Sequence, residues 1–261
     1  MKLLEYKTSP NIRALSTKRG EGSGNYAGFN ITHYCGDNIE HITECRNELC
    51  SLLGIKENRL ILPRQTHGCE TLCIEKDFFE LSKEEQEKLL YGIDAIITDL
   101  PRTCIGVSTA DCIPILLHDS TKGVIAAVHA GWRGTVAKIV TYCIETMQKR
   151  YHCCTKDIKA IIGPGISVDS FEVGDEVYDT FTQAGFAMEK IAKRYPATNN
   201  KEKWHIDLWE ANRLQMIESG IPANYIDISG ICTYKQHHEF FSARRLGINS
   251  GRIFNGIINE K

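Results

Sequence analysis

The chain has 261 residues, of which 42% are hydrophobic and 25% are charged, and its formal net charge is -2. This composition is typical of a globular protein, and the nearly balanced, interspersed charge argues against nucleic acid or an anionic membrane as the main partner. No apolar run approaches the roughly 20 residues that span a bilayer, and the first residues lack the apolar core of a signal peptide. We therefore expect a cytoplasmic protein whose partner is a small molecule.

Apolar runs typical of strands alternate along the chain with helical patterns. The strand-like runs are residues 60–62, 95–97, 104–107, 115–117, 124–128, 158–162 and 225–228. The helical patterns are residues 39–52, 83–91, 136–147 and 208–217. Because the middle strands follow each other without helices, we predict an α+β fold, with a single domain (1–261) and a mixed β-sheet core flanked by helices. The polar stretch Ala192 to Lys203, which includes Asn199 and Asn200, is predicted to be an exposed loop.

The eleven cysteines are expected to be reduced, because disulfides are rare in the cytoplasm. Most of them are predicted to be buried thiols within helical patterns. Cys112 is of more interest, because it precedes a predicted hairpin that ends at His129. If Asp119 to Lys122 form the loop, His118 pairs with Gly123 and Cys112 lies directly opposite His129. Opposed residues are close enough to share one metal ion or one Cys–His hydrogen bond.

Further candidate residues lie in loops that follow predicted strands. His67 follows the first strand in the segment Arg64-Gln65-Thr66-His67-Gly68, where the glycine allows a sharp turn beside the imidazole. His129 opens the segment His129-Ala130-Gly131-Trp132-Arg133-Gly134, which leads into a helix that Thr135 could cap. A helix amino terminus beside Arg133 is an arrangement that suits phosphate or carboxylate. Near the carboxyl end, Arg244 and Arg245 add two more cations.

Five segments in order give the chain a specific family resemblance from about Asn25 to the carboxyl terminus. They are Gln65-Thr66-His67-Gly68, Thr109-Ala110-Asp111-Cys112, His129-Ala130-Gly131-Trp132-Arg133-Gly134, Gly163-Pro164-Gly165-Ile166 and Phe241-Ser242-Ala243-Arg244-Arg245. Together they resemble the laccase-domain family, once called multicopper polyphenol oxidases and now regarded as zinc-dependent purine nucleoside phosphorylases. The resemblance implies that His67, Cys112 and His129 are metal ligands. It also implies phosphorolysis of adenosine, inosine, guanosine and methylthioadenosine, with adenosine deamination as a second activity.

The ligand count favours zinc over a multicopper centre. Copper clusters of laccases need many imidazoles, usually in His-x-His pairs, and this chain contains no such pair. Two histidines and one cysteine leave a fourth position open, as in a catalytic zinc site, although copper binds such a set at least as tightly. For phosphorolysis, Arg133 is the candidate phosphate ligand, with Arg64, Arg245 and Gln65 as further substrate-binding residues. Asp111 is the candidate general acid or base, solely because it precedes Cys112.

Two other functions stay open at this point. Cys112 could be a thiolate nucleophile with His129 as its base and His67 or Gln65 as the orienting group. The protein would then be a Cys-His amidohydrolase acting on peptidoglycan precursor peptides, since members of the same family have been considered peptidoglycan-editing factors. A non-enzymatic zinc-binding or redox-sensing protein is the third possibility, and it would need a fourth protein ligand such as His33 or Cys35.

Overall fold

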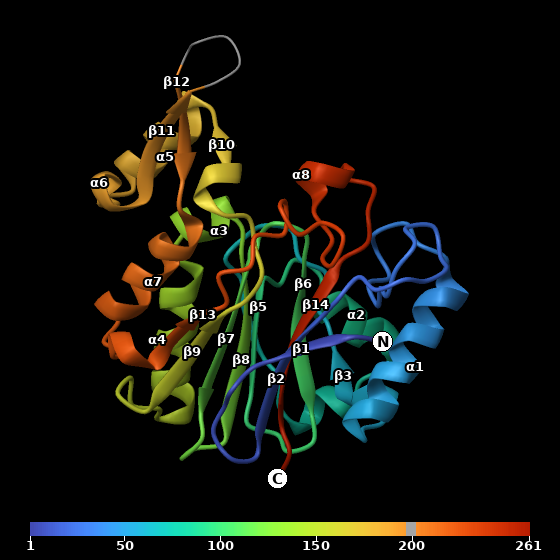
Figure 1. The fold of residues 1–261 in the computed structure, drawn as a ribbon. Coiled ribbons are helices and arrows are strands. Elements are labelled where there is room, and N and C mark those ends of the chain that lie inside the picture. The colour runs from blue at the N-terminus through green and yellow to red at the C-terminus, as the bar shows by residue number, and fades with distance from the viewer. Residues whose placement is uncertain (197–201) are drawn as a thin grey trace.

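The centre of the computed structural model, which describes residues 1–196 and 202–261, consists of two β-sheets packed face to face (Figure 1). The first sheet has five strands in the order β1-β2-β14-β6-β3. These strands are β1 (Leu3–Glu5), β2 (Ile12–Thr17), β14 (Ile253–Asn259), β6 (Cys104–Thr109) and β3 (Leu60–Ile61). All neighbours in this sheet are antiparallel except β3 and β6, which are parallel.

The second sheet has six strands in the order β13-β9-β7-β8-β5-β4. They are β13 (Ile226–Ile228), β9 (Ile158–Ile162), β7 (Ile113–Asp119), β8 (Val124–Ala130), β5 (Ala95–Thr98) and β4 (Thr71–Cys73). The two outer pairs are parallel and the inner pairs antiparallel, so both sheets are mixed. Apolar side chains from both sheets, among them Ile105, Leu116, Ile125 and Ile257, form the core between them.

Helices cover the outer faces of the two sheets (Figure 1). Helix α1 (Ile39–Leu53) packs on the five-stranded sheet, whereas α4 (Ile139–Tyr151) and α7 (Leu208–Glu218) pack on the six-stranded sheet. Sequence signals mark both ends of α1: the Asn38 side chain accepts hydrogen bonds from two backbone N–H groups of the first turn, and Gly54 ends the helix at φ 62°. The result is a helix–sheet–sheet–helix arrangement, which confirms the predicted α+β class with mixed sheets flanked by helices.

The remaining elements are shorter. The helices are α2 (Lys83–Leu90), α3 (Trp132–Val136), α5 (Asp175–Gln183), α6 (Met188–Ile191) and α8 (Ala243–Leu246), with single 3-10 turns at Glu57–Arg59, Lys76–Glu80, Val168–Ser170 and Ala223–Tyr225. A small third sheet has the order β10-β12-β11, made of β10 (Glu172–Val173), β12 (Glu202–Ile206) and β11 (Ala192–Pro196). In the described part of the chain, no helix is long and apolar enough to cross a bilayer.

The polar stretch from Ala192 to Lys203 is not simply a loop. Its first part is strand β11 and its last part begins strand β12, and the two strands pair antiparallel. Arg194 lies opposite Trp204, and its guanidinium carbon is 4.3 Å from the centre of the indole ring. This cation–π contact is one interaction by which a polar residue pairs across the two strands. The Asn199-Asn200 pair lies outside the described residues.

The loop of the β7–β8 hairpin begins and ends one residue later than predicted. Asp119 pairs with Val124, so the loop consists of residues 120–123, and Pro114 rather than Cys112 lies opposite His129. The Asp119 carboxylate accepts hydrogen bonds from two backbone N–H groups of the loop, and Gly123 has a φ of 73°, which favours glycine. The shift moves each pairing by two residues and therefore keeps Cys112 and His129 on the same face.

Candidate metal centre

The site lies where the chain passes twice from the five-stranded sheet to the six-stranded sheet. His67 lies in the connection from β3 to β4, and Cys112 lies in the connection from β6 to β7. His129 is near the end of β8, beside the start of its hairpin partner β7. The starts of β4 and β7 and the end of β8 lie at the same end of the six-stranded sheet, which brings together three residues that are far apart in the sequence.

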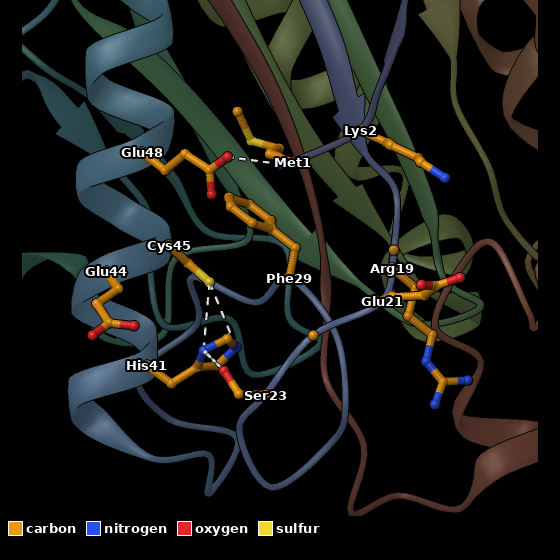
Figure 2. A pocket seen from close by; sticks show the side chains of 12 residues that line it. Met1, Lys2, Arg19, Glu21, Ser23, Phe29, His41, Glu44, Cys45 and Glu48 are labelled. Carbon is orange, nitrogen blue, oxygen red and sulfur yellow. Dashed lines mark hydrogen bonds and ion pairs between the residues drawn. The ribbon is translucent and has the colours of Figure 1, made fainter.

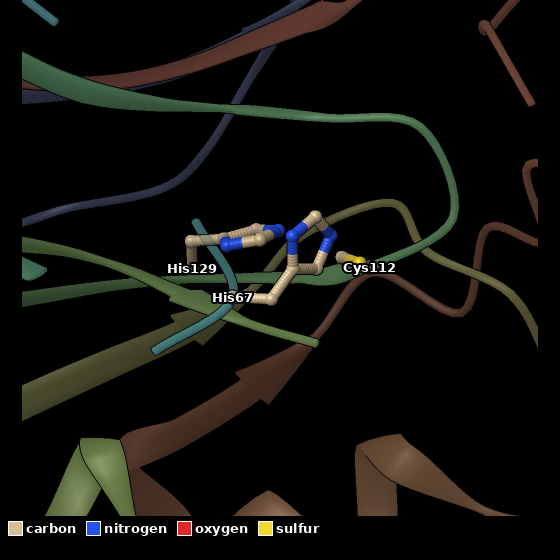
Figure 3. Close-up of side chains that lie close together, drawn as sticks. All are labelled: His67, Cys112 and His129. Carbon is tan, nitrogen blue, oxygen red and sulfur yellow. The ribbon is translucent and has the colours of Figure 1, made fainter. Parts of the chain in front are cut away.

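Figure 3 shows the side chains of His67, Cys112 and His129 gathered at this point. One ligand atom from each residue can be chosen so that all three atoms lie within 4.8 Å of one another. The imidazole rings of His67 and His129 meet edge to face, with centroids 4.9 Å apart. His129 is only 3% exposed, whereas His67 is exposed and Cys112 is partly exposed, so the cluster is open to solvent on one side.

The Cys112 thiolate and the charged His129 imidazole stabilise each other. Burial raises the pKa of Cys112, but the charge of His129 and contacts with both imidazoles outweigh it, so the pKa lies well below its usual value. Burial lowers the pKa of His129, but the Cys112 thiolate and the Asp94 carboxylate outweigh that effect and raise it. Cys112 is therefore a thiolate at neutral pH, which is the form that binds metal or acts as a nucleophile.

Asp94 is a site residue that the sequence analysis missed. It is fully buried immediately before β5, and its Oδ1 accepts a hydrogen bond from His129 Nδ1 at 2.7 Å. Burial would raise the pKa of this carboxyl group, but the hydrogen bond and charge of His129 and backbone N–H groups lower it. The available sequence signal was an aspartate at the edge of the apolar run Ala95-Ile96-Ile97, where an unpaired carboxylate would be costly.

The loop after β8 differs from the prediction at its helix. Helix α3 begins at Trp132 with Gly131 as its N-cap, and Thr135 lies inside the helix, where its hydroxyl accepts a hydrogen bond from Asn212. The prediction that Thr135 caps the helix is therefore wrong. Lys138, at φ 59°, separates α3 from α4. A Cβ on Gly131 would lie 3.1 Å from Cys112 Sγ and 3.2 Å from His67 Cδ2, so glycine allows α3 to approach the cluster.

Asp111 and Gln65 are both occupied by contacts within the protein. The Asp111 carboxylate accepts hydrogen bonds from the Thr233 hydroxyl at 2.6 Å and the Arg244 backbone N–H at 2.7 Å. The Gln65 amide donates to the backbone carbonyl of Ser108 at 2.8 Å and accepts from its N–H at 2.9 Å. In this structure these side chains hold the two sheet-crossing loops in place.

The three predicted arginines are exposed and lie in different parts of the structure. The guanidinium carbon of Arg133 is 4.2 Å from the centre of the Trp132 ring. Arg245 donates a hydrogen bond to the Tyr234 hydroxyl at 3.3 Å. Arg64 lies over Tyr34 and Tyr91 on the wall of a cavity of about 840 Å³. Of these arginines, Arg133 lies in the helix whose N-cap, Gly131, borders Cys112 and His67.

A second cavity, of about 370 Å³, lies between the amino-terminal segment and α1 (Figure 2). It contains none of the predicted site residues. Its histidine, His41, donates a hydrogen bond from Nε2 to the Gly28 carbonyl at 2.9 Å, and its Nδ1 lies 3.3 Å from the Ser23 hydroxyl. The same Nε2 is 3.5 Å from Cys45 Sγ. Burial raises the pKa of Cys45, so this thiol stays protonated and unreactive.

The donor set suits a transition metal. Two imidazoles and a thiolate are ligands that zinc and copper both accept, and three protein ligands leave a position for water or substrate. Among residues 1–196 and 202–261, this is the only group of three or more such side chains placed to hold a metal ion. Cys35, one candidate fourth ligand, instead donates its thiol hydrogen to the Thr32 carbonyl, and His33, the other, lines the cavity beside Arg64.

The open His-Cys-His cluster has the donors of a metal-binding site with one position left for water or substrate. A family model described as multi-copper polyphenol oxidoreductase laccase matches residues 13–260, and the chain belongs to this family. The family predicted from the five sequence segments is thus confirmed.

Similar proteins cover nearly the whole chain. A protein named purine nucleoside phosphorylase from Bacteroides thetaiotaomicron is 46% identical over 255 residues, which is 96% of this chain and 93% of that protein. Adenosine deaminase RL5, from an unknown prokaryotic organism, is 45% identical over 256 residues, covering 97% and 96% of the two chains. The crystal structure of YlmD from Geobacillus stearothermophilus is similar with a TM-score of 0.86 at 27% identity, over 97% of this chain and 94% of that chain.

Proposed function

We propose that the protein is a zinc-dependent purine nucleoside phosphorylase. It would cleave adenosine, inosine, guanosine and S-methyl-5'-thioadenosine with phosphate, giving the free base and ribose 1-phosphate or methylthioribose 1-phosphate. Deamination of adenosine would be a second activity. The observation that supports this proposal most is the open cluster of two imidazoles and a thiolate, in a chain that is 46% and 45% identical to proteins named for these two activities.

His67, Cys112 and His129 would hold the zinc ion. When bound, zinc supplies a Lewis acid that lowers the pKa of water and polarises a substrate oxygen. The exposed side of the cluster, next to His67, leaves room for substrate, while buried His129 anchors the site in β8. We do not propose a multicopper oxidase, because such an enzyme needs several copper sites and the described residues contain a single three-ligand cluster.

Phosphorolysis requires cations that hold phosphate while positive charge develops on the ribose. Arg133 is our candidate, since Gly131, two residues before it, lies against Cys112 and His67. Helix α3 has only five residues, so we assign phosphate binding to the guanidinium group rather than to the helix end. Arg64 and Arg245 are further candidates, and the cavity beside Arg64 has a volume typical of small-molecule sites.

Gln65 and Asp111 are already engaged in contacts within the protein. Gln65 bonds the Ser108 backbone through its amide oxygen and one N–H. Both carboxylate oxygens of Asp111 accept hydrogen bonds, from Thr233 and Arg244. We propose that both residues mainly keep the loops of His67 and Cys112 in position.

Replacing Arg133 by alanine is expected to raise the KM for phosphate about 10- to 100-fold, because a charge-assisted hydrogen bond is worth about 1.5–3 kcal/mol. The KM for inosine should change much less, since this role assigns the guanidinium group to phosphate and not to the purine. Steady-state kinetics with each substrate varied in turn measures both constants. Arg150→Ala is the matched control, because Arg150 is exposed at the end of α4 and pairs with Glu75. An unchanged KM for phosphate would remove Arg133 from this role.

Removal and return of the metal tests the proposed function. Chelator treatment should abolish phosphate-dependent cleavage of inosine, and one equivalent of zinc should restore it. The same titration with copper shows which metal supports activity. Phosphorolysis that persists in fully metal-free protein would contradict the proposal.

One observation keeps the Cys-His amidohydrolase as a second candidate. Asp94 accepts the hydrogen bond of His129 Nδ1, so Cys112, His129 and Asp94 also have the order of a nucleophile, base and orienting group. The orienting residue would then be Asp94 rather than His67 or Gln65. A hydrolase of this kind would act on peptidoglycan precursor peptides without metal, and zinc would inhibit it by binding the thiolate.

The remaining predictions concern organisation and location. We propose that residues 1–261 form one domain, which agrees with the match of one family model to residues 13–260. We also propose a cytoplasmic location, because all eleven cysteines are free thiols, as expected in a reducing compartment.

A further inference from the structure

One buried carboxylate contacts the segments of both histidines in the cluster. Asp94 Oδ1 lies 2.7 Å from His129 Nδ1 and 3.1 Å from the backbone nitrogen of His67. Its Oδ2 accepts the N–H groups of Gly68 at 2.8 Å and Thr66 at 3.2 Å. The two oxygens therefore accept four hydrogen bonds, and the side chain is 0% exposed.

The first of these contacts sets the tautomer of the His129 ring. A carboxylate can only accept a hydrogen bond, so His129 Nδ1 must carry a proton. In the neutral imidazole, Nε2 then has a free lone pair, which is the form that binds a metal. The His129 backbone N–H also donates to the Asp94 carbonyl at 2.8 Å, which fixes the position of the ring relative to the carboxylate.

The other contacts set the conformation of the His67 loop. His67 has a φ of 63°, in the left-handed region that non-glycine residues adopt at an energetic cost. Three consecutive N–H groups, from Thr66 to Gly68, converge on the Asp94 carboxylate, and this compensates for the strain. The His67 side chain consequently lies beside His129, with ring centroids 4.9 Å apart.

From these contacts we propose that Asp94 is a positioning residue that arranges both histidines for metal binding. The inference rests on the metal site of the proposed function, but it concerns metal affinity rather than the reaction. The nearly isosteric asparagine cannot replace this aspartate, because an amide has only one accepting oxygen. If that oxygen faces Gly68, the amide NH₂ faces His129 and favours the wrong tautomer. If it faces His129, the NH₂ opposes the N–H groups of Thr66 and Gly68.

The test compares Asp94→Asn with Asp99→Asn, because Asp99 is exposed at the other end of the same strand, β5. Zinc affinity is measured by competition with a chromophoric chelator, and the metal-free fold by circular dichroism and thermal unfolding. Asp94→Asn is expected to bind zinc about 10- to 100-fold more weakly than the wild type at a temperature where both are folded. Asp99→Asn should bind zinc with unchanged affinity.

A purely structural role would give a different result. It would lower the thermal midpoint of the metal-free protein while leaving the zinc affinity of the folded protein unchanged, and that result would overturn the proposal. If Asp94→Asn does not fold, Asp94→Ser is measured in the same way. Serine is smaller, and its single hydroxyl oxygen cannot replace the two carboxylate oxygens that accept the four hydrogen bonds. A folded serine variant with wild-type zinc affinity would equally overturn it. Because the readout is zinc binding, the result stands whether or not the protein cleaves nucleosides.

Discussion

Cys112→Ala is expected to abolish stoichiometric zinc binding and to lower phosphorolysis of inosine at least about 100-fold, because catalytic metal contributes several kcal/mol of transition-state stabilisation. The variant removes the only sulfur of the three-ligand cluster and leaves two imidazoles whose rings are 4.9 Å apart. It also removes the thiolate that raises the pKa of His129, so this histidine becomes less basic. Metal analysis after gel filtration and a phosphate-dependent cleavage assay measure the two effects.

The matched control for this substitution is Cys154→Ala, because Cys154 is an exposed free thiol outside the cluster. This variant should keep its zinc and its activity. Loss of activity in Cys112→Ala with a full equivalent of bound zinc would contradict the metal role of Cys112. That outcome would favour the nucleophile role instead, in which the thiolate itself attacks the substrate.

Acid is expected to destabilise the metal-free protein through His118, far along β7 from the cluster. His118 is 1% exposed, its Nε2 lies 3.2 Å from Ser9 Oγ, and its Nδ1 has no partner. Burial, together with the positive charge of Lys159 directly opposite on β9, lowers the pKa of His118 to about 4. Below the ordinary histidine pKa, the unfolded chain takes up a proton that the folded protein does not accept. Stability is thus complete above about pH 6.5 and is lost between about pH 6.5 and pH 4, by about 3 kcal/mol.

Urea unfolding at both ends of this pH range, in the presence of a chelator, measures this effect. His118→Gln removes the titrating group, so its loss of stability on acidification should be about 3 kcal/mol smaller than that of the wild type. His152→Asn is the control, because His152 is exposed and asparagine tolerates its φ of 55°. If His118→Gln and the wild type lose the same stability on acidification, His118 is not the group that causes the loss.

Much of the candidate metal centre could be predicted because its three residues lie in short segments with unusual residue combinations. His67, Cys112 and His129 were identified from such segments, and the structure brings all three together. The predicted register of the hairpin was wrong by two residues, yet the same face was retained because strand side chains alternate with a period of two. The error arose from Gly123, whose positive φ places it within the loop.

Other parts could not be predicted because they depend on contacts between distant segments. Strand β14 was missed, since its buried Asn255 interrupts an apolar pattern and makes hydrogen bonds to Ser16 and Thr109 on neighbouring strands. Asp94 was missed for the same reason: its partners are 26 or more residues away in the sequence. The roles of Arg64, Arg133 and Arg245 stay predictions, because exposed side chains take their final positions only around a substrate.

The most direct test of the proposed activity is product analysis. Purified protein with quantified zinc is incubated with inosine or adenosine, with and without phosphate, and the products are separated by chromatography. The account predicts hypoxanthine or adenine together with ribose 1-phosphate, formed only when phosphate is present, and inosine formed from adenosine as a second product. Zinc-loaded protein that releases no free base from either nucleoside in the presence of phosphate would contradict it.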